Sequence, residues 1–309
     1  MSSDSAIETH ELSRRFRRKN AVQNLTLRVP TGSVFAFLGP NGAGKTTTIK
    51  MLMSILRASS GSGTVLGGNI QKLRPDIVAQ IGYVSENQKM PDWMTVGGLL
   101  NYCKPWYPTW DDALCERLLR QFDLPLDRKL KHLSRGMKTK AELLSVLAFR
   151  PKLLMLDEPF SGLDPLVRDE FIRGVLELTE QEQWTIFVSS HDIDEVERFA
   201  NWVGIINNGR LELCESVVGL QSRFRRVEVV LAGDSTATHQ ALPSDCLLPE
   251  VSGRTVRFID SAATAHERED ALRRLFPSDV RMTATPMSLR EIFLALARQF
   301  RLVEGGGAK

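Results

Sequence analysis

The chain has 309 residues, of which 42% are hydrophobic and 25% charged, and this balance is typical of globular proteins rather than collagen-like, disordered or low-complexity chains. At a typical ~100–200 residues per domain, the length allows two domains. The 40 Lys and Arg residues against 37 Asp and Glu leave a formal net charge of +3. Because that charge is small, no nucleic-acid partner is expected from it.

The ends and the cysteines indicate the compartment. Four scattered cysteines with no Cys-x-x-Cys pair fit neither a zinc ribbon nor a disulfide framework. Asp4, Glu8 and Glu11 lie where a signal peptide needs an apolar stretch, and no apolar run approaches the ~20 residues that span a bilayer. We therefore expect a cytoplasmic protein; if it serves a membrane, another chain spans it.

Short apolar runs alternate with amphipathic segments along the first two thirds of the chain, which predicts an α/β domain over residues 1–219. We expect buried parallel strands at Val34–Leu38, Leu153–Leu156 and Thr185–Val188. Three- and four-residue spacing of apolar residues predicts helices at Thr46–Leu56, Asp112–Phe122, Lys138–Phe149 and Pro165–Glu180. Between Trp93 and Arg150 no strand pattern occurs, so residues 91–150 are expected to form a helical insertion.

The pattern changes near Gly219. Alternation predicts strands at Arg226–Leu231 and Thr255–Ile259, and helical spacing predicts helices at Thr264–Leu275 and Leu289–Phe300. Residues 220–309 are therefore expected to form a small α+β domain.

A phosphate-binding loop follows the first apolar strand. The segment Gly39-Pro-Asn-Gly-Ala-Gly-Lys-Thr46 fits G-x-x-x-x-G-K-[ST] between a strand and a helix. Such a loop turns backbone N–H groups toward phosphates, while Lys45 reaches the outer phosphates and Thr46 ligates Mg²⁺. The alternative, a turn that only connects strand and helix, does not explain the complete motif.

Two acids end the strand that begins at Leu153. Buried carboxylates need a partner, and a metal ion beside phosphates provides one. Asp157 is then a candidate Mg²⁺ ligand, and Glu158 a candidate for polarising the attacking water. Alone, the pair could also be acids at a helix start.

From Leu12 to Leu213 the chain resembles the nucleotide-binding subunits of ATP-binding cassette (ABC) transporters. Four further motifs carry the resemblance: Ile81–Glu86 in the Q-loop place, Leu133–Lys138 like the family signature, Ser161–Pro165 like the D-loop, and Ser190–Asp192 like the switch-histidine motif.

The resemblance implies a P-loop NTPase cassette with a RecA-like α/β core, an antiparallel β edge and a helical subdomain. It implies ATP hydrolysis with Glu158 and His191 as catalytic residues, Mg²⁺ held by Thr46, Glu86 and Asp157, and a homodimer that sandwiches two ATP molecules. The ATP-contacting positions of the family fall on Phe16, Gly39, Pro40, Asn41, Gly42, Ala43, Gly44, Lys45, Thr46, Thr47, Glu86, Ser134, Gly136, Asp157 and Asp164.

Two positions depart from the family pattern. Arg135 stands where the signature usually has glycine; its guanidinium either contacts the partner's ATP phosphate or projects into solvent, and we expect the latter. Glu86 stands where the Q-loop has glutamine, with Gln88 as a competing candidate. A carboxylate oxygen can ligate Mg²⁺ as an amide oxygen does.

The segments Pro105–Asp111, Leu133–Lys138 and Pro286–Leu294 look like the bacterial branch that works with ABC-2-type permeases, which includes drug, antibiotic-resistance and cell-envelope exporters. The expected partner is a separate permease, with the chain peripheral on the cytoplasmic face of the membrane.

The aromatic residues Trp93, Trp106, Tyr107 and Trp110 are either a permease-docking surface or the core of the helical insertion. A soluble ABC ATPase acting on ribosomes or DNA is the alternative function, although the chain has one cassette and no long insertion before the signature. A small-molecule kinase would have no use for the signature.

Overall fold

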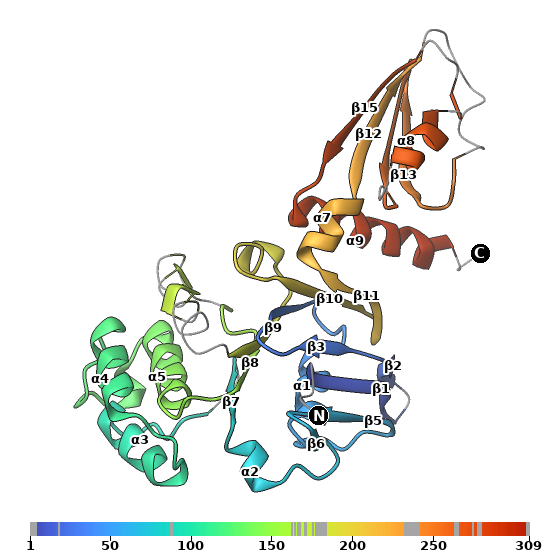
Figure 1. Ribbon diagram of the computed structural model, residues 1–309. Helices are drawn as coiled ribbons and strands as arrows, with labels where there is room; N and C mark the ends of the chain where they lie inside the picture. The colour runs from blue at the N-terminus through green and yellow to red at the C-terminus, as the bar shows by residue number, and fades with distance from the viewer. Residues whose placement is uncertain are drawn as a thin grey trace. The chain divides into compact units, whose positions relative to one another are not determined.

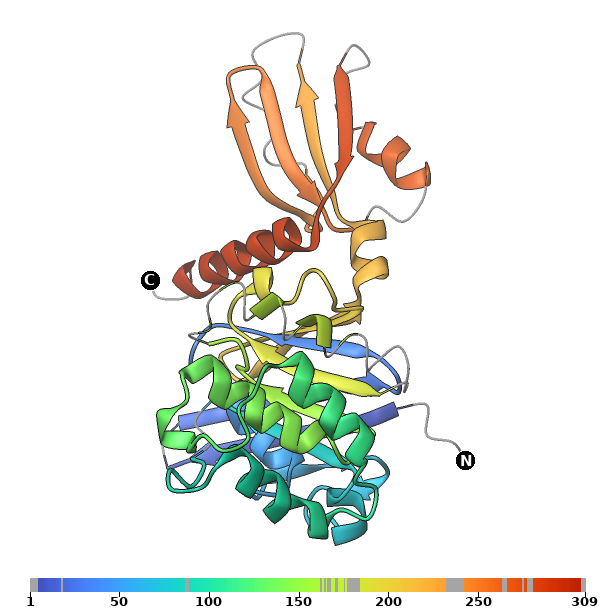
Figure 2. The ribbon, with the colours of Figure 1, turned by 90° about the vertical axis from the view of Figure 1, so that its left-hand side faces the viewer.

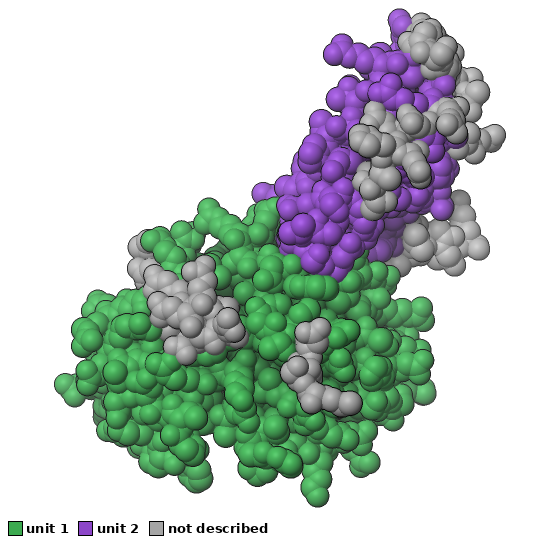
Figure 3. Space-filling view, viewed as in Figure 1, with its two compact units in different colours: residues 1–214 green, residues 215–309 purple. Residues whose placement is uncertain are grey.

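The computed structural model describes residues 5–17, 19–86, 89–161, 184–231, 242–262, 266–273, 275–276 and 280–306, with residues 163, 165, 168–169, 172–174 and 176 between them. The chain divides into two compact units, residues 1–214 and 215–309 (Figure 3). Gly219, after which a domain boundary was expected, lies inside helix α7 (Val217–Arg223), which belongs to the second unit.

The core of the first unit is a six-stranded sheet with strand order β11-β10-β4-β9-β8-β7 (Figure 1). Its strands are β4 (Val34–Leu38), β7 (Ile81–Ser85), β8 (Leu153–Asp157), β9 (Thr185–Ser190), β10 (Trp202–Asn207) and β11 (Arg210–Ser216). β10, β4, β9, β8 and β7 pair in parallel, and β4, β8 and β9 are buried along their whole length. Burial on both faces explains why each of these strands contains an apolar run, although β8 ends in Asp157 and β9 ends in Ser189 and Ser190. The three expected strands are confirmed.

Parallel pairing of the strands also determines where the candidate functional residues lie. The phosphate-binding loop follows β4, Asp157 ends β8, and His191 directly follows β9. Because β4, β9 and β8 are adjacent and parallel, their carboxyl ends meet at one edge of the sheet.

A second sheet flanks this core. Its order is β2-β1-β5-β6, with β3 also pairing with β1, and all of these pairs are antiparallel. The strands are β1 (Ser5–Phe16), β2 (Lys19–Leu25), β3 (Arg28–Pro30), β5 (Ser60–Val65) and β6 (Gly68–Asn69). The α/β cassette fold with an antiparallel edge is thereby confirmed.

Helices gather beside β7, as Figures 1 and 2 show in green. They are α3 (Val96–Cys103), α4 (Asp112–Gln121) and α5 (Arg135–Leu147), with the 3-10 turns η1 (Lys104–Trp106) and η2 (Leu130–His132). All of residues 91–150 are described, and no strand runs through them. α5 packs against β7, α3 and α4, so it joins this helical subdomain to the core sheet.

In the first unit, α5 and α1 (Lys45–Leu52) differ from their expected bounds for local reasons, and in the second unit α9 (Leu289–Gly306) continues past the expected end at Phe300. α5 begins earlier because the hydroxyl of Ser134 accepts a hydrogen bond from the Met137 N–H and caps the helix. α1 ends earlier than expected, and Ser54 follows with a φ of 59°, outside the helical region. Of the helix expected at residues 165–180, the described residues 165, 168–169, 172–174 and 176 are helical, and the remainder lie outside the described part.

The second unit holds a four-stranded antiparallel sheet of order β13-β14-β12-β15. Besides α7 it contains β12 (Arg225–Val230), β13 (Cys246–Ser252), β14 (Thr255–Asp260), α8 (His266–Arg273), β15 (Arg281–Pro286) and α9 (Leu289–Gly306). β13 and β15 were not expected: β13 carries Leu248 at φ 48° beside a register shift, and β15 is exposed at most positions and ends in proline. None of the helices formed by the described residues is long and apolar enough to cross a bilayer.

Candidate functional site

The loop between β4 and α1 needs glycine at two positions for different reasons. Gly44, which precedes α1, has a φ of 113°, and a Cβ there would lie 2.5 Å from the carbonyl oxygen of Ala21. A Cβ on Gly39 would lie 2.2 Å from the carbonyl oxygen of Ile206. The glycine spacing of the motif is therefore required by close packing of the loop against β2 and β10.

A pocket opens over this loop. It is lined by residues from four places in the sequence: Phe16, Lys19 and Ala21; Asn41, Gly42, Gly44, Lys45, Thr46 and Thr47; Glu86; and Glu158. Phe16 is 42% exposed, and the Arg14 guanidinium lies 4.6 Å from the centre of its ring. The ring therefore lines the pocket beside the loop with the Arg14 guanidinium over it, and stacking of adenine on Phe16 stays a prediction.

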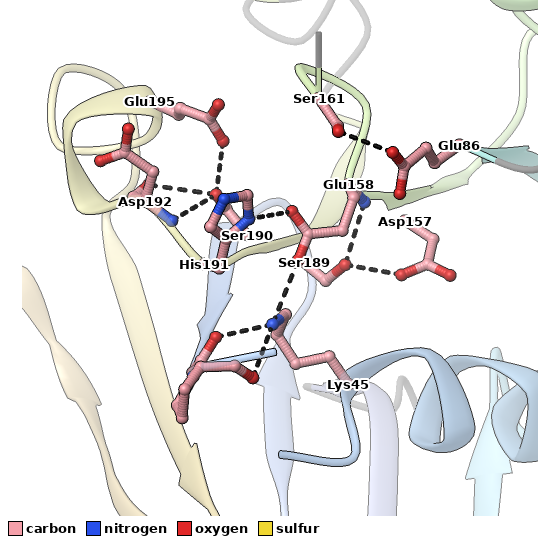
Figure 4. A network of polar contacts seen from close by, with 12 residues as sticks. Lys45, Glu86, Asp157, Glu158, Ser161, Ser189, Ser190, His191, Asp192 and Glu195 are labelled. Carbon is pink, nitrogen blue, oxygen red and sulfur yellow. Dashed lines mark hydrogen bonds and ion pairs between the residues drawn. The ribbon is translucent and has the colours of Figure 1, made fainter. Parts of the chain in front are cut away.

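Lys45, Glu158 and His191 form a chain of polar contacts (Figure 4). The Lys45 ammonium is buried, donates to the Gly39 carbonyl at 2.6 Å and lies 3.1 Å from Oε1 of Glu158. Oε2 of Glu158 lies 2.8 Å from His191 Nδ1, which donates the proton because an ionised carboxylate can only accept. Glu158 has a φ of 51°, a conformation that costs free energy in a non-glycine residue and is typical of functional sites.

Asp157 lies deeper and is held by two hydroxyls. Its Oδ1 accepts from Thr46 Oγ1 at 3.1 Å and from Ser189 Oγ at 2.8 Å. Burial raises the pKa of this carboxyl, so a cation at the site would stabilise its ionised form. Hydroxyl and carboxylate oxygens are the donors that Mg²⁺ prefers, and Thr46 and Asp157 therefore fit the metal expected from the sequence.

A buried glutamate supports the turn that carries His191. The hydroxyl of Ser190 donates to Glu195 Oε2, and the Arg168 guanidinium lies 3.5 Å from Oε1 of the same carboxylate. Burial raises the pKa of Glu195 above its ordinary value. Together with the hydrogen bond from the Asp192 N–H to the Ser190 hydroxyl, at 3.0 Å, these contacts fix the turn between β9 and the 3-10 helix η3 (Ile193–Glu195).

The Glu86 side chain has different partners from those expected. Its Oε1 accepts from Ser161 Oγ at 2.6 Å and from Arg135 Nη2 at 3.0 Å, while Glu86 also lines the pocket that contains Thr46. The expectation that Arg135 only projects into solvent is therefore wrong: the side chain is half-exposed but is paired with Glu86. The backbone N–H of Glu86 donates to the Asp157 carbonyl, which keeps the residue beside the strand that carries the acids.

The remaining candidates are placed as follows. Ser134 and Gly136 lie at the start of α5, where Ser134 is the helix cap. Asp164 and Gln88 lie outside the described residues. Ser161, Ser189 and Glu195 were not singled out from the sequence. Ser161 follows Glu158 closely, and Ser189 and Glu195 lie near His191 in the sequence, but a hydroxyl or carboxylate in a motif does not reveal its partner.

Comparison with known proteins shows similarity in sequence and in fold. The family described as ABC transporter matches residues 22–161. The bacitracin transport ATP-binding protein BcrA of Bacillus licheniformis is 33% identical over 207 residues, covering 66% of this chain and 68% of that protein. The ABC transporter ATP-binding protein YtrB of Bacillus subtilis is 24% identical over 298 residues, covering 94% of this chain and 97% of that protein. A solved structure described as the ATP-binding subunit of an ABC transporter has a TM-score of 0.64 and 28% identity, covering 70% of this chain and 92% of its own.

Proposed function

Because this chain belongs to the ATP-binding proteins of ABC transporters, we propose that it binds MgATP over the phosphate loop and hydrolyses it to drive a separate membrane permease. The observation that carries this proposal is the position of Glu158. Its carboxylate lies between the Lys45 ammonium and the His191 imidazole, at the wall of the pocket that contains the loop. The proposed base Glu158, the Lys45 ammonium and the His191 imidazole thus lie together beside the phosphate-binding loop.

Each group has a distinct task in this proposal. Backbone N–H groups of the loop and the Lys45 ammonium balance the charge of the outer phosphates. Glu158 accepts the proton of the attacking water, and His191, fixed through Nδ1, keeps that carboxylate oriented. Mg²⁺, held by Thr46 and Asp157 with Glu86 within reach of the same pocket, would stabilise charge on the transferred phosphoryl group.

A second copy of the chain completes the proposed site. Ser134 and Gly136 lie at the N-terminus of α5, whose partial positive charge favours an anion. By resemblance, these residues face the ATP held by the second copy, and Asp164 links the two sites across the dimer. Homodimerisation around two ATP molecules is accordingly part of the proposal.

We propose that the permease is of the ABC-2 type, that it works in export, and that it holds this chain on the cytoplasmic face of the membrane. Similarity to YtrB over nearly the whole chain and to the bacitracin transport protein supports a transport role over a ribosome- or DNA-associated one. Within the helical subdomain, Trp93 is 72% and Trp106 is 68% exposed, which supports docking by these two rings. Tyr107 instead stacks on Phe149 with ring centres 3.8 Å apart and is half-buried.

The test of the enzymatic part is phosphate release from MgATP by the purified chain. Glu158→Gln keeps the shape of the side chain and removes the base, so we expect hydrolysis to fall by at least a hundredfold while ATP remains bound. Glu116→Gln on the exposed face of α4 is the matched control. Equal hydrolysis by Glu158→Gln and wild type would refute the proposed chemistry.

The test of the transport part is co-purification. We expect a membrane permease to co-purify with wild type and to be lost from Trp93→Ala/Trp106→Ala, whose ATP binding stays intact. Co-purification with ribosomes instead of a permease would refute the transport role, and ATP-dependent uptake into the cell would refute export.

A further inference from the structure

The two residues that depart from the family pattern contact each other. Arg135 Nη2 donates to Glu86 Oε1 at 3.0 Å, although the residues are 49 positions apart in the sequence. Glu86 directly follows β7, and Arg135 is the first residue of α5. Their ion pair therefore joins the start of the signature helix to the core sheet.

We propose that Arg135 is a positioning residue for Glu86, and that the two departures form one coupled replacement. The arginine neutralises and orients a carboxylate that stands where the family has a neutral amide. This inference rests on the proposed function, because it concerns the same ATP site.

The location of Glu86 carries the argument. Glu86 and Glu158 line the pocket over the phosphate loop, and both also line a second pocket of about 100 Å³ that is shared with Arg135 and Ser161. Glu86 thus stands between the nucleotide pocket and the signature loop. A residue that holds the Glu86 carboxylate in place therefore changes the electrostatic potential in the pocket where ATP is proposed to bind.

The hydrogen bonds fix one oxygen of that carboxylate. Ser161 Oγ donates to Oε1 at 2.6 Å, and the Arg135 guanidinium donates to the same atom. The Arg135 guanidinium also lies 3.5 Å from the Ser161 hydroxyl, so the three side chains form a closed triangle. Such an arrangement restrains the rotation of Glu86 more than a single contact does.

Charge explains why glutamate at position 86 would need the arginine. An unpaired carboxylate beside Glu158 would add repulsion toward a polyphosphate, whereas glutamine would add none. The side chains of Arg135 and Glu86 are 54% and 34% exposed, so solvent screens part of this interaction. We therefore expect a coupling of about three- to tenfold in ATP affinity and turnover.

Because Glu86 and Arg135 belong to two different motifs, their contact also has a second role. By resemblance, the Q-loop position serves the ATP bound by its own chain, whereas the signature serves the ATP bound by the second copy. The Arg135–Glu86 contact then connects the two half-sites within one chain, and a change at one of them reaches the other through a single ion pair.

A double-mutant cycle tests the coupling. Wild type, Arg135→Gly, Glu86→Gln and the double variant are compared by MgATP affinity and by kcat and KM for hydrolysis, with thermal unfolding as a check of folding. We expect Arg135→Gly to weaken MgATP affinity and to raise KM at least threefold when Glu86 is present. In the Glu86→Gln background the same substitution should have little effect, and Arg135→Lys should restore most of the loss seen with Glu86.

Arg128→Gly, at an exposed arginine of the same subdomain, is the matched control and should behave as wild type. Equal losses from Arg135→Gly in both backgrounds would overturn the inference and indicate that the arginine acts on another group, such as the partner's phosphate. No loss in either background would also overturn it. A wild-type chain that binds no MgATP would instead refute the proposed function, and this inference with it.

Discussion

Glu142 offers a sharp test of how burial acts in this fold. The residue lies in α5, is only 8% exposed, and borders the pocket that contains Glu86, Arg135 and Lys138. Burial raises the pKa of its carboxyl from 4.5 to about 7, and the nearby Lys138 ammonium offsets a small part of that rise. The folded chain therefore holds a proton at Glu142 that the unfolded chain releases at lower pH.

The sign and size of the effect follow from linkage. Because the folded pKa is raised, the contribution of Glu142 to stability is full below pH 4.5 and is lost as the pH rises through about 7. A rise from 4.5 to about 7 corresponds to about 3 kcal/mol, and about 2 kcal/mol of it falls between pH 5 and pH 8. Glu142→Gln mimics the protonated carboxyl and does not titrate, so it should be free of this loss.

The measurement is the free energy of urea unfolding of wild type and Glu142→Gln from pH 5 to pH 8. We expect the difference between the two proteins to change by about 2 kcal/mol in favour of the variant as the pH rises. Asp157 and Glu195, whose pKa values burial also raises, are present in both proteins and cancel in the difference. Glu116→Gln, at an exposed glutamate of α4, should show no such pH dependence relative to wild type. A difference that stays constant across this range would refute the reasoning.

Three further predictions concern the proposed ATP site. Lys45→Ala should reduce MgATP affinity by at least a hundredfold, as measured by equilibrium dialysis, because it removes the buried ammonium of the phosphate cradle; unchanged affinity would remove Lys45 from the site. Glu158→Gln with MgATP should elute as a dimer in size-exclusion chromatography, since ATP persists without hydrolysis, and a monomer under these conditions, with normal wild-type turnover, would contradict the sandwich arrangement. A chain truncated after residue 219 should fold and bind MgATP, because the candidate ATP residues lie upstream; a folded truncation that binds none would show that the second unit takes part in the site.

The sequence by itself determined those elements that can be recognised from a short run of neighbouring residues. The strands β4, β8 and β9 are buried on both faces, and each contains an apolar run that makes it visible without a structure: Val34–Leu38, Leu153–Leu156 and Ile186–Val188. The motif from Gly39 to Thr46 is likewise visible in the sequence, although the close contacts that require Gly39 and Gly44 are with Ile206 and Ala21. Parallel strands then bring the loop, Asp157 and His191 to one edge, so most of the site was predictable.

Only the tertiary structure decided which side chains meet. Thr46 and Asp157 are 111 residues apart, and Arg135 and Glu86 are 49 apart, so their contacts depend on sheet order and on the packing of α5 against β7. Tyr107 stacks on Phe149 and is half-buried, whereas Trp106, the residue before it, is exposed. A polar or aromatic residue carries no local record of a distant partner, because its contact energy arises only after the backbone has brought both groups together. Folding therefore decided that Arg135 pairs with Glu86 and does not merely project into solvent.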